Sequence, residues 1–564
     1  MMPGPKRICA LGRIKRDTQE KGMSRKKLAG KAKKAPEQTP ASKRIMKDLV
    51  ALYVFFMFAI YPLYYENKYY NMGDAKWHFF KWVTLIAMIA MACVFIWYQL
   101  HLLSVGKIKE YWDLSATSIV DRFVLAYAFL AVISFLLSPY KVDTLFGYDG
   151  WYMGLVSQLA FVAIYYFVSR FWRWDELLVT GYLAVSSVVF LLCLLNRFGI
   201  DPMEMYVDLE EQYYLKFVST LGQTTWFSSY MVLLFPIGLF VFWYSKSMVK
   251  TVAAGVYVFL GAMTMIEQNS DSAFLAYGFI YLVLFMASFK ENIRMRRFLE
   301  SLVLLFAGWK TIGILQVVFS DRVVMVESFM TALSVGPISW VLLGLSAALL
   351  ILYIRAMGNE HFSIETLGKV RYVVAVITVV IIAAIGVYVV LNTKGVFAGT
   401  PFASDNNYLF FDDRWGNSRG SSWKITVATF LRTEPIRKLF GVGPDGFHNE
   451  VYRFFNDELV AQWGQDKVLT CAHNEWMNAI INMGVIGGIA YIGVFISGMI
   501  RYSKKSIETP ETLAVVMCIA GYMAHNFFCY QQIICTPAIF IIMGAGEMMS
   551  RYGKREIWEQ EGDL

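Results

Sequence analysis

The chain has 564 residues, of which 57% are hydrophobic and only 17% are charged. Soluble globular proteins are about half apolar and about a quarter charged, so this composition argues for lipid as the main solvent and against a cytosolic enzyme. The formal net charge of +9 comes from the start of the chain, because residues 1–47 hold 15 Lys and Arg against three acids and the remainder is net acidic. Because the basic excess is confined to this tail and the rest of the chain is net acidic, we expect no nucleic acid among the partners.

The first 44 residues form a basic tail. This tail is rich in Lys, contains Pro36 and Pro40, and carries too much charge for a cleavable signal peptide. We predict that residues 1–44 stay disordered in the cytoplasm, close to anionic lipid headgroups.

Beyond the tail, short polar breaks separate apolar stretches that are long enough to cross a hydrocarbon layer of about 30 Å as helices. We place fourteen such spans near residues 45–63, 79–99, 119–138, 152–169, 177–195, 225–244, 251–267, 272–288, 299–319, 329–354, 371–391, 474–500, 512–530 and 533–549. The expected fold is an all-α membrane protein, a polytopic helical bundle of about 12–14 transmembrane helices with one long extracytoplasmic loop.

The positions of the cations predict the orientation of this bundle. With the basic tail inside, 20 later Lys and Arg fall on the inner side, whereas the short outer loops hold only Lys68, Lys76, Lys141, Arg197, Lys216 and Arg322. Because cytoplasmic loops are enriched in Lys and Arg, we expect both termini in the cytoplasm, with residues 550–564 as a second tail. Residues 45–391 then hold transmembrane helices one to eleven, and residues 474–549 hold helices twelve to fourteen.

Residues 392–473 form the long polar loop, which the parity of the spans places on the extracytoplasmic side. Residues 421–433 and 447–462 have helical amphipathic spacing, and the run Gly441–Pro444 marks a turn between them. Loops of this length in compact folds are usually functional or disordered. The many aromatic residues and the equal numbers of acids and bases favour an ordered cap that contains short helices.

The most informative residues lie in this loop and in the span after it. Four features follow one another there: Arg419 before Trp423, the turn Gly441-Val-Gly-Pro444, the sequence Cys471-Ala-His473-Asn474-Glu475, and a span with Gly484, Gly487 and Gly488. In kind and order these features resemble the O-antigen ligase and O-antigen polymerase family of membrane glycosyltransferases. Two earlier segments, 138–155 and 219–236, are similar to the same family.

One stretch departs from the family pattern. The family commonly has Ser-Arg-Gly at the outer end of a mid-chain span, where the arginine faces the pyrophosphate of a lipid-linked donor, whereas this chain has Asp271 in that place. The resemblance therefore implies that another cation holds the donor phosphate, or that the donor differs. Arg322, Lys216 and Arg197 in neighbouring outer loops are the candidates.

The implied reaction suits the residue types of the loop. Moving a sugar from a polyprenyl pyrophosphate to an acceptor hydroxyl expels a pyrophosphate and passes through a cationic sugar. Guanidinium groups bind phosphate oxygens bidentately and stay protonated, so Arg419 and Arg414 suit the leaving group. His473 can take the acceptor's proton at neutral pH, and Asn474 or Glu475 would orient its ring.

Other interpretations remain open for some of these residues. Arg414 follows Asp412–Asp413, so a local ion pair is equally consistent with the sequence, and the two acids are a weak signal for a divalent cation. Lys310 lies near the centre of the ninth span, where a charged side chain is costly and is usually paired or functional. It would pair with Glu267 or Asp271, or bind substrate phosphate.

We therefore predict a glycosyltransferase in the cytoplasmic (inner) membrane of a bacterium that needs no cofactor and no metal. It takes a glycan from a polyprenyl-pyrophosphate carrier and joins it to a glycan, lipid or wall acceptor, so ligase and polymerase activity both remain open. The chief alternative is a flippase or transporter of lipid-linked saccharides, although the sequence has no internal repeat of the kind that transporters show. A non-catalytic scaffold is the third alternative.

Overall fold

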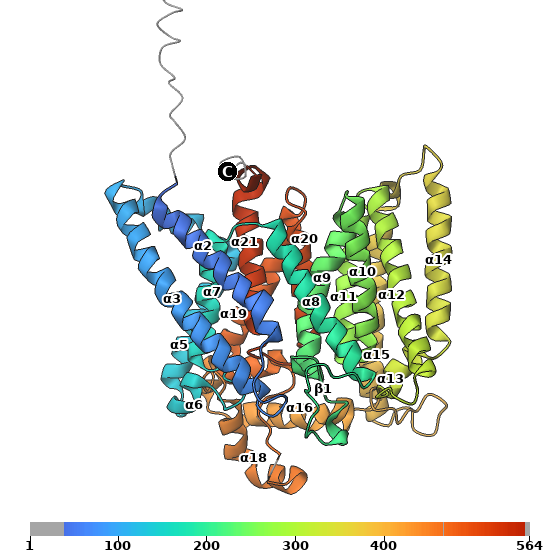
Figure 1. The fold of residues 1–564 in the computed structure, drawn as a ribbon. Coiled ribbons are helices and arrows are strands. Elements are labelled where there is room, and N and C mark those ends of the chain that lie inside the picture. Colours follow the sequence, from blue (N-terminus) through green and yellow to red (C-terminus); the bar gives the residue numbers. More distant parts are fainter. Residues whose placement is uncertain (1–38, 466, 559–564) are drawn as a thin grey trace, which may run out of the picture.

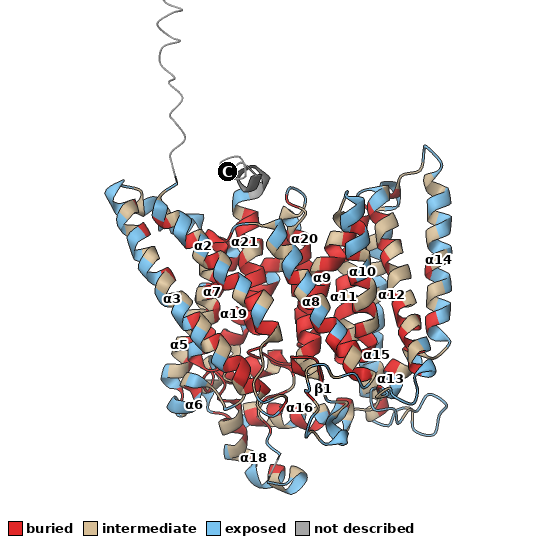
Figure 2. Cartoon of the chain, in the orientation of Figure 1, coloured by how far each residue is buried: buried red, intermediate tan, exposed pale blue. Residues whose placement is uncertain are grey.

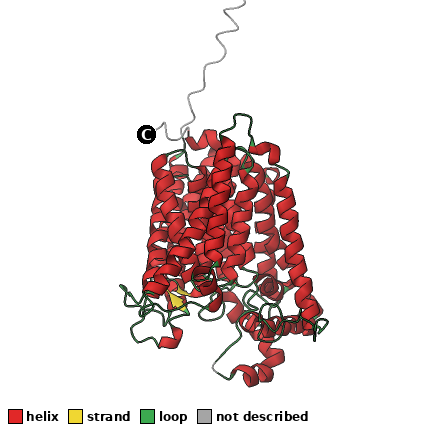
Figure 3. Cartoon of the chain, turned by 90° about the vertical axis from the view of Figure 1, so that its right-hand side faces the viewer, coloured by secondary structure: helices red, strands yellow, loops and turns green. Residues whose placement is uncertain are grey.

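The computed structural model describes residues 39–465 and 467–558, and its elements are almost all helices (Figure 1, Figure 3). Residues 1–38 of the predicted basic tail and residues 559–564 of the second tail lie outside the described residues. The sheet structure in the described part is one antiparallel hairpin of two short strands, β1 (Phe217–Val218) and β2 (Gly222–Gln223).

Eleven helices within the described ranges are long and apolar enough to cross a membrane. They are α2 (Ala41–Phe55, continued by π and 3-10 turns to Leu63), α3 (Met72–Ser104), α5 (Ile119–Leu137), α8 (Glu176–Arg197), α9 (Thr224–Tyr244), α10 (Met248–Glu267), α11 (Ser272–Ser288), α12 (Asn292–Val318), α14 (Ile338–Met357), α15 (Val370–Thr393) and α19 (Glu475–Lys505). Two shorter apolar helices, α7 (Leu155–Phe171) and α20 (Thr512–His525), and the helix α21 (Thr536–Trp558) complete the bundle. The predicted all-α polytopic membrane fold is confirmed.

Short helices connect the long ones: α4 (Ile108–Tyr111), α6 (Lys141–Phe146), α13 (Ser328–Ser334), α16 (Trp415–Arg432), α17 (Pro435–Phe440) and α18 (Phe447–Trp463). Single 3-10 turns cover Leu114–Ala116, Glu211–Tyr213 and Ile364–Leu367. The helices α16, α17 and α18 lie between α15 and α19, where the sequence predicted short helices in the long loop.

Two predicted spans differ from the observed helices. The span 329–354 is two helices, α13 and α14, because Pro337 cannot donate a backbone hydrogen bond within a helix and instead precedes the first residue of α14. The span 512–530 ends at His525, and residues 526–535 form an irregular segment between α20 and α21. Part of the backbone of this segment bonds to Glu475 at the start of α19, which replaces helical hydrogen bonds.

The long helices run side by side, and the connecting elements gather at the two ends of the bundle (Figure 1). The helices α16 and α18 and the β hairpin lie at the end opposite the beginning of α2 and the end of α21. Within the bundle, α19 packs against α5 and α20, α21 packs against α7, and α9 packs against α10 and α20. Since α19 follows α18 in the chain, α19 begins at the end that carries α16–α18.

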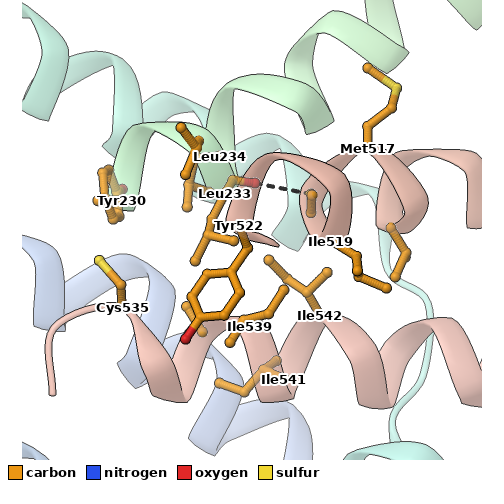
Figure 4. Packing of buried hydrophobic residues seen from close by; sticks show 14 of the residues in the cluster. Tyr230, Leu233, Leu234, Met517, Ile519, Tyr522, Cys535, Ile539, Ile541 and Ile542 are labelled. Atoms are coloured by element: carbon orange, nitrogen blue, oxygen red, sulfur yellow. Dashed lines mark hydrogen bonds between the residues drawn. The ribbon is translucent and has the colours of Figure 1, made fainter. Parts of the chain in front are cut away.

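Burial is highest in the middle of the bundle and falls toward its edges (Figure 2). In the most apolar 18 residues of each helix, 78% of α9 is buried, but none of α15 is. The core joins α9, α20 and α21, where Tyr522 lies among Leu233, Leu234, Ile539 and Ile542 (Figure 4). The apolar surfaces of α14 and α15 are exposed, which suits contact with lipid.

Candidate functional site

The geometry at the start of α16 fixes Arg419. Gly416, Asn417 and Ser418 are left-handed, with φ of 56°, 63° and 68°, so the regular helix begins only at Arg419. The Nε of Arg419 donates to the carbonyl of Phe528 at 3.0 Å, and its Nη1 donates to the carbonyl of Gly416 at 2.7 Å. The guanidinium also lies 5.9 Å from the ring centroid of Phe528. A guanidinium has five N–H groups, so Arg419 is held in place and keeps donors for another partner.

His473 lies in the turn that precedes α19 and has a φ of 50°. Asn474 caps the helix, because its Oδ1 accepts the backbone N–H groups of Trp476 and Met477 at 3.0 and 3.1 Å. The imidazole packs edge-on against Tyr530, with 5.2 Å between the ring centroids. This turn thus directs the imidazole toward the segment between α20 and α21.

Arg419 and His473 interact electrostatically. Burial first, and then the positive charge of Arg419, lower the pKa of His473 from its usual value to about 4. The imidazole is therefore neutral at pH 7, the state in which it can accept a proton. The two residues that the sequence predicted as catalytic lie close together in the fold.

The imidazole is not oriented by Asn474 or Glu475, in contrast to the prediction. Asn474 is used as the cap of α19, while Glu475 accepts the backbone N–H of Gln531 at 2.7 Å and donates its own backbone N–H to the carbonyl of Asn526 at 2.9 Å. No described residue makes a hydrogen bond to the ring of His473. Asn474 and Glu475 instead fix the turn and the segment on which the ring rests.

Three of the predicted substrate-binding cations, Arg414, Arg322 and Lys216, are exposed. The side chain of none of them forms an ion pair within the described part of the chain. The local ion pair considered for Arg414 is absent there, because Asp413 pairs with Lys424 at 2.8 Å. These three cations are free to meet an anionic substrate.

Arg197 is not free. It is fully buried, and its Nε, Nη1 and Nη2 donate to the carbonyls of Glu267, Tyr214 and Leu215 at 2.8, 2.7 and 3.1 Å. The side chain thus joins the end of α8 to the end of α10 and to the loop before β1. Its predicted role in phosphate binding is wrong for this structure, since backbone carbonyls occupy all three guanidinium nitrogens.

Lys310 of α12 does not pair with Glu267 or Asp271. Its Nζ donates to the carbonyls of residues 334–336 at 2.9 to 3.4 Å and lies 5.2 Å from the ring centroid of Trp340. These carbonyls lie at the C-terminal end of α13. Carbonyl groups at this end of a helix lack helical hydrogen-bond partners and interact favourably with a positive charge. Lys310 is therefore a helix cap between α12 and α13, and we do not retain it as a substrate ligand.

Asp271, which stands where the family commonly has an arginine, borders the loop. Tyr408 donates a hydrogen bond to its Oδ2. The pKa of Glu327 is raised by burial and then by the charge of Asp271, and it is lowered by Arg419. The charges of Asp271 and Arg419 thus act on Glu327 in opposite directions. Glu327 and Tyr408 could not be recognised from the sequence, since each stands outside any motif.

The turn Gly441–Pro444 is built into the bundle. Val442 and Gly443 donate their backbone N–H groups to the carbonyls of residues 481–482 at 3.1 and 3.0 Å, where α19 is broken at Gly484 (φ 72°). A Cβ on the first glycine of the turn would lie 2.2 Å from the carbonyl oxygen of residue 482. Only glycine permits this approach, which explains why the turn and the glycine-containing helix occur together.

Asp445 joins the same turn to the loop before α7. Its Oδ2 accepts the backbone N–H groups of Tyr148 and Met153 at 2.8 and 3.1 Å. Two segments that separately resemble the family, 138–155 and the loop after α17, thus lie in contact. Asp445 directly follows the turn that carries part of the resemblance, but its sequence position alone suggests no role for it.

Residues 322–492 match the family model described as O-antigen ligase. This range contains Arg419, the turn Gly441–Pro444 and His473, which the structure places at one end of the bundle. Residues 322–492 belong to the O-antigen ligase family. No curated protein matches the chain.

The O-antigen ligase domain gives the chain a general role in joining glycans at a membrane, with a lipid-linked glycan donor and a glycan acceptor. The ligase domain does not form the site alone. Asp445 contacts the loop before α7, and Arg419 and His473 contact Phe528 and Tyr530, which lie outside the matched range on either side. Segments that precede and follow the matched range therefore contact the candidate site.

Proposed function

We propose that the chain is a glycosyltransferase that moves a glycan from a polyprenyl-pyrophosphate carrier to an acceptor hydroxyl on the outer side of a bacterial cytoplasmic membrane. The observation that carries this proposal is the common support of Arg419 and His473, which both contact the segment Phe528–Tyr530. The reaction needs a fixed positive charge for the leaving group and a neutral base for the acceptor.

In this proposal, Arg419 binds the leaving pyrophosphate. The bond between the anomeric carbon and the phosphate oxygen breaks, and the pyrophosphate leaves with the electron pair. Arg419 stays charged at all relevant pH values and has N–H groups that no described residue uses. The exposed side chains of Arg414, Arg322 and Lys216 provide further positive charge for the donor.

His473 receives the proton. As the acceptor oxygen forms its bond to the anomeric carbon, its proton passes to an imidazole nitrogen. Burial, and then the charge of Arg419, keep the pKa of His473 low in the free protein. A bound pyrophosphate would offset that charge, so the imidazole becomes a stronger base when the donor is present. Side chains thus perform both steps of this scheme, without a metal.

The fold supports an outer location for the site. The helices α16 and α18 lie at the end of the bundle opposite the beginning of α2 and the end of α21 (Figure 1). The beginning of α2 lies within the strongly basic residues 1–47, and cytoplasmic segments are enriched in Lys and Arg. The site then faces away from the cytoplasm.

Reconstitution tests the proposal. Purified full-length protein in liposomes is given a synthetic polyprenyl-pyrophosphate glycan together with candidate glycan, lipid and wall acceptors. We expect a new glycosidic product and released polyprenyl pyrophosphate. Transfer of the donor between leaflets without formation of a glycosidic bond would contradict the proposal and support the flippase.

Matched variants test whether the activity depends on His473 and Arg419. His473→Ala and Arg419→Ala should abolish transfer in protein that still folds, whereas Lys424→Ala, an exposed cation on the same helix as Arg419, should not. The turnover of all three variants is compared with that of the original protein in the same liposomes.

A further inference from the structure

Two successive short helices of the long loop, α16 and α17, expose apolar side chains. Val427 and Leu431 lie about one turn apart on α16, and Ile436 and Leu439 lie about one turn apart on α17, so the members of each pair share a face of their helix. These four side chains are 50%, 66%, 50% and 47% exposed. Single exposed apolar residues are ordinary, but an apolar face on two successive helices needs a partner or an apolar solvent.

The helix α19 shows at which depth α17 lies. Residues 476–500 carry no charge and Arg501 follows, so counted back from Arg501 a hydrocarbon layer that takes about 20 helical residues begins near residue 481. The backbone N–H of Val442 donates to the carbonyl of Ile481 at 3.1 Å. A Cβ on Gly484 would lie 2.2 Å from the backbone carbonyl of Leu439. The end of α17 therefore lies at the boundary of the hydrocarbon or inside it.

The helix α5 gives the same depth independently. Its apolar span covers Ile119–Leu137, and Ser134 lies one turn before the end of this span. The hydroxyl of Ser134 donates to the carbonyl of Asn482 at 2.6 Å and accepts the backbone N–H of Gly443 at 3.1 Å. The turn after α17 thus lies within the length of two membrane-spanning helices, and α17 is set into the end of the bundle.

The surroundings of α17 suit lipid. Ile486 and Ile489, on the part of α19 just beyond the contact with α17, are 39% and 62% exposed within its apolar stretch. Residues 427–440 carry three cations, Arg432, Arg437 and Lys438, against the single acid Glu434. Apolar side chains beside long cationic ones are typical of helices at the boundary between lipid headgroups and acyl chains.

We infer that residues 427–440 are inserted into the lipid leaflet at this end of the bundle. Their four exposed apolar side chains lie among acyl chains, and their three cations lie at the level of the lipid phosphates. A soluble partner would have to reach below the headgroups to cover Leu439, so lipid is the occupant of this face.

Insertion anchors the helix that carries Arg419. The side chain of Arg419 bonds to Phe528, just beyond the end of α20, so it lies at the same end of the bundle as the inserted segment. Under the proposed function, the anchored helix keeps this guanidinium beside the lipid surface, where a carrier-linked pyrophosphate lies. The insertion itself does not depend on that function.

Spin labels measure the depth directly. Leu431→Cys and Ile436→Cys are made singly in full-length protein in which Cys9 and Cys93 are serine, since the other cysteines are buried. Each labelled variant is reconstituted in vesicles of phosphatidylcholine and anionic phosphatidylglycerol. The accessibility of the label to O₂, which concentrates among acyl chains, is compared with its accessibility to a water-soluble nickel chelate. Unfolding temperatures equal to that of the cysteine-reduced parent show that the variants fold.

Both labels should be more accessible to O₂ than to the nickel chelate, at a depth of about 5–10 Å. Glu458→Cys is the control, because Glu458 is exposed on α18, which lies farther from the bundle than α16 (Figure 1). Its label should be more accessible to the nickel chelate.

Access of the nickel chelate to positions 431 and 436 equal to that at 458 would overturn the inference, because these side chains would then lie in water. Low access of both reagents would overturn it as well, because a protein partner or a second copy of the chain would then cover them. The measurement uses no glycan donor, so either failure leaves the proposed function standing.

Discussion

Arg419 and His473 are fixed by two residues of one irregular segment. Arg419 Nε donates to the carbonyl of Phe528 at 3.0 Å, and the imidazole of His473 packs against the ring of Tyr530 with 5.2 Å between centroids. The connection between α20 and α21 therefore sets the relative position of the two side chains, although neither belongs to it.

Loss of the guanidinium should reduce transfer strongly. Arg419→Ala is expected to lower kcat/KM by about 10²–10³, as removal of one fixed transition-state donor commonly does. Arg419→Lys should be intermediate, because lysine keeps the charge but not the planar fork. Steady-state kinetics with a lipid-linked donor measures both, and equal activity of the lysine variant and the original protein would show that charge alone is sufficient.

The activity should depend on pH through His473. Its pKa in the free protein is about 4, so kcat/KM should stay constant from neutral pH to about pH 5 and fall near pH 4. Arg419→Gln removes the neighbouring positive charge, so kcat/KM of this variant should begin to fall at a higher pH. An acid limb at the ordinary histidine pKa, or one that Arg419→Gln leaves in place, would contradict the close pairing.

The same titration affects stability. The folded protein holds His473 neutral below the ordinary histidine pKa of about 6.5, whereas the unfolded chain takes up the proton there. This contribution to stability is thus present above about pH 6.5 and is lost as the pH falls toward 4. Unfolding temperatures of His473→Gln should depend less on pH in this range, and an unchanged dependence would exclude His473 as its source.

Removal of Asp271, whose charge acts on Glu327 together with that of Arg419, should favour donor binding. Asp271→Asn takes away one negative charge near the proposed pyrophosphate site and should lower the donor KM about three- to tenfold, the size of a single charge interaction near a protein surface. Glu434→Gln, which removes an exposed acid elsewhere in the loop, is the control. A donor KM that rises in Asp271→Asn would place the pyrophosphate elsewhere.

Arg197 should matter for folding. Arg197→Met leaves three carbonyls without their charged donor and should destabilise the protein by about 2–5 kcal/mol, as the loss of one partner from a buried charged interaction does. Thermal unfolding should show the change, and the donor KM of the folded fraction should stay the same. A raised KM at full stability would restore the role that the sequence suggested for this residue.

The membrane fold could be predicted because long apolar runs in lipid permit little besides helices. The irregular segment after His525 could be predicted only in part, since the sequence places a break between two spans at residues 531–532, whereas the segment extends over residues 526–535. Hydrogen bonds of Gln531 and Asn526 to Glu475 help to keep this segment irregular, and Glu475 lies far away in the sequence.

A common location of Arg419 and His473 could be expected because each stands in a motif of fixed order, and their catalytic roles stay predictions. Charge and position alone suggest substrate binding for Arg197 and Lys310. Their partners in the structure are backbone carbonyls, which have no signature in the sequence.

A single-turnover comparison of the original protein with His473→Ala, with donor binding measured on the same samples, tests whether His473 is the base. We expect the original protein to release one polyprenyl pyrophosphate for each glycosidic bond formed. We expect His473→Ala to bind the donor with similar affinity and to form the bond about 10²–10⁴-fold more slowly. Near-normal bond formation by His473→Ala would contradict this role of His473.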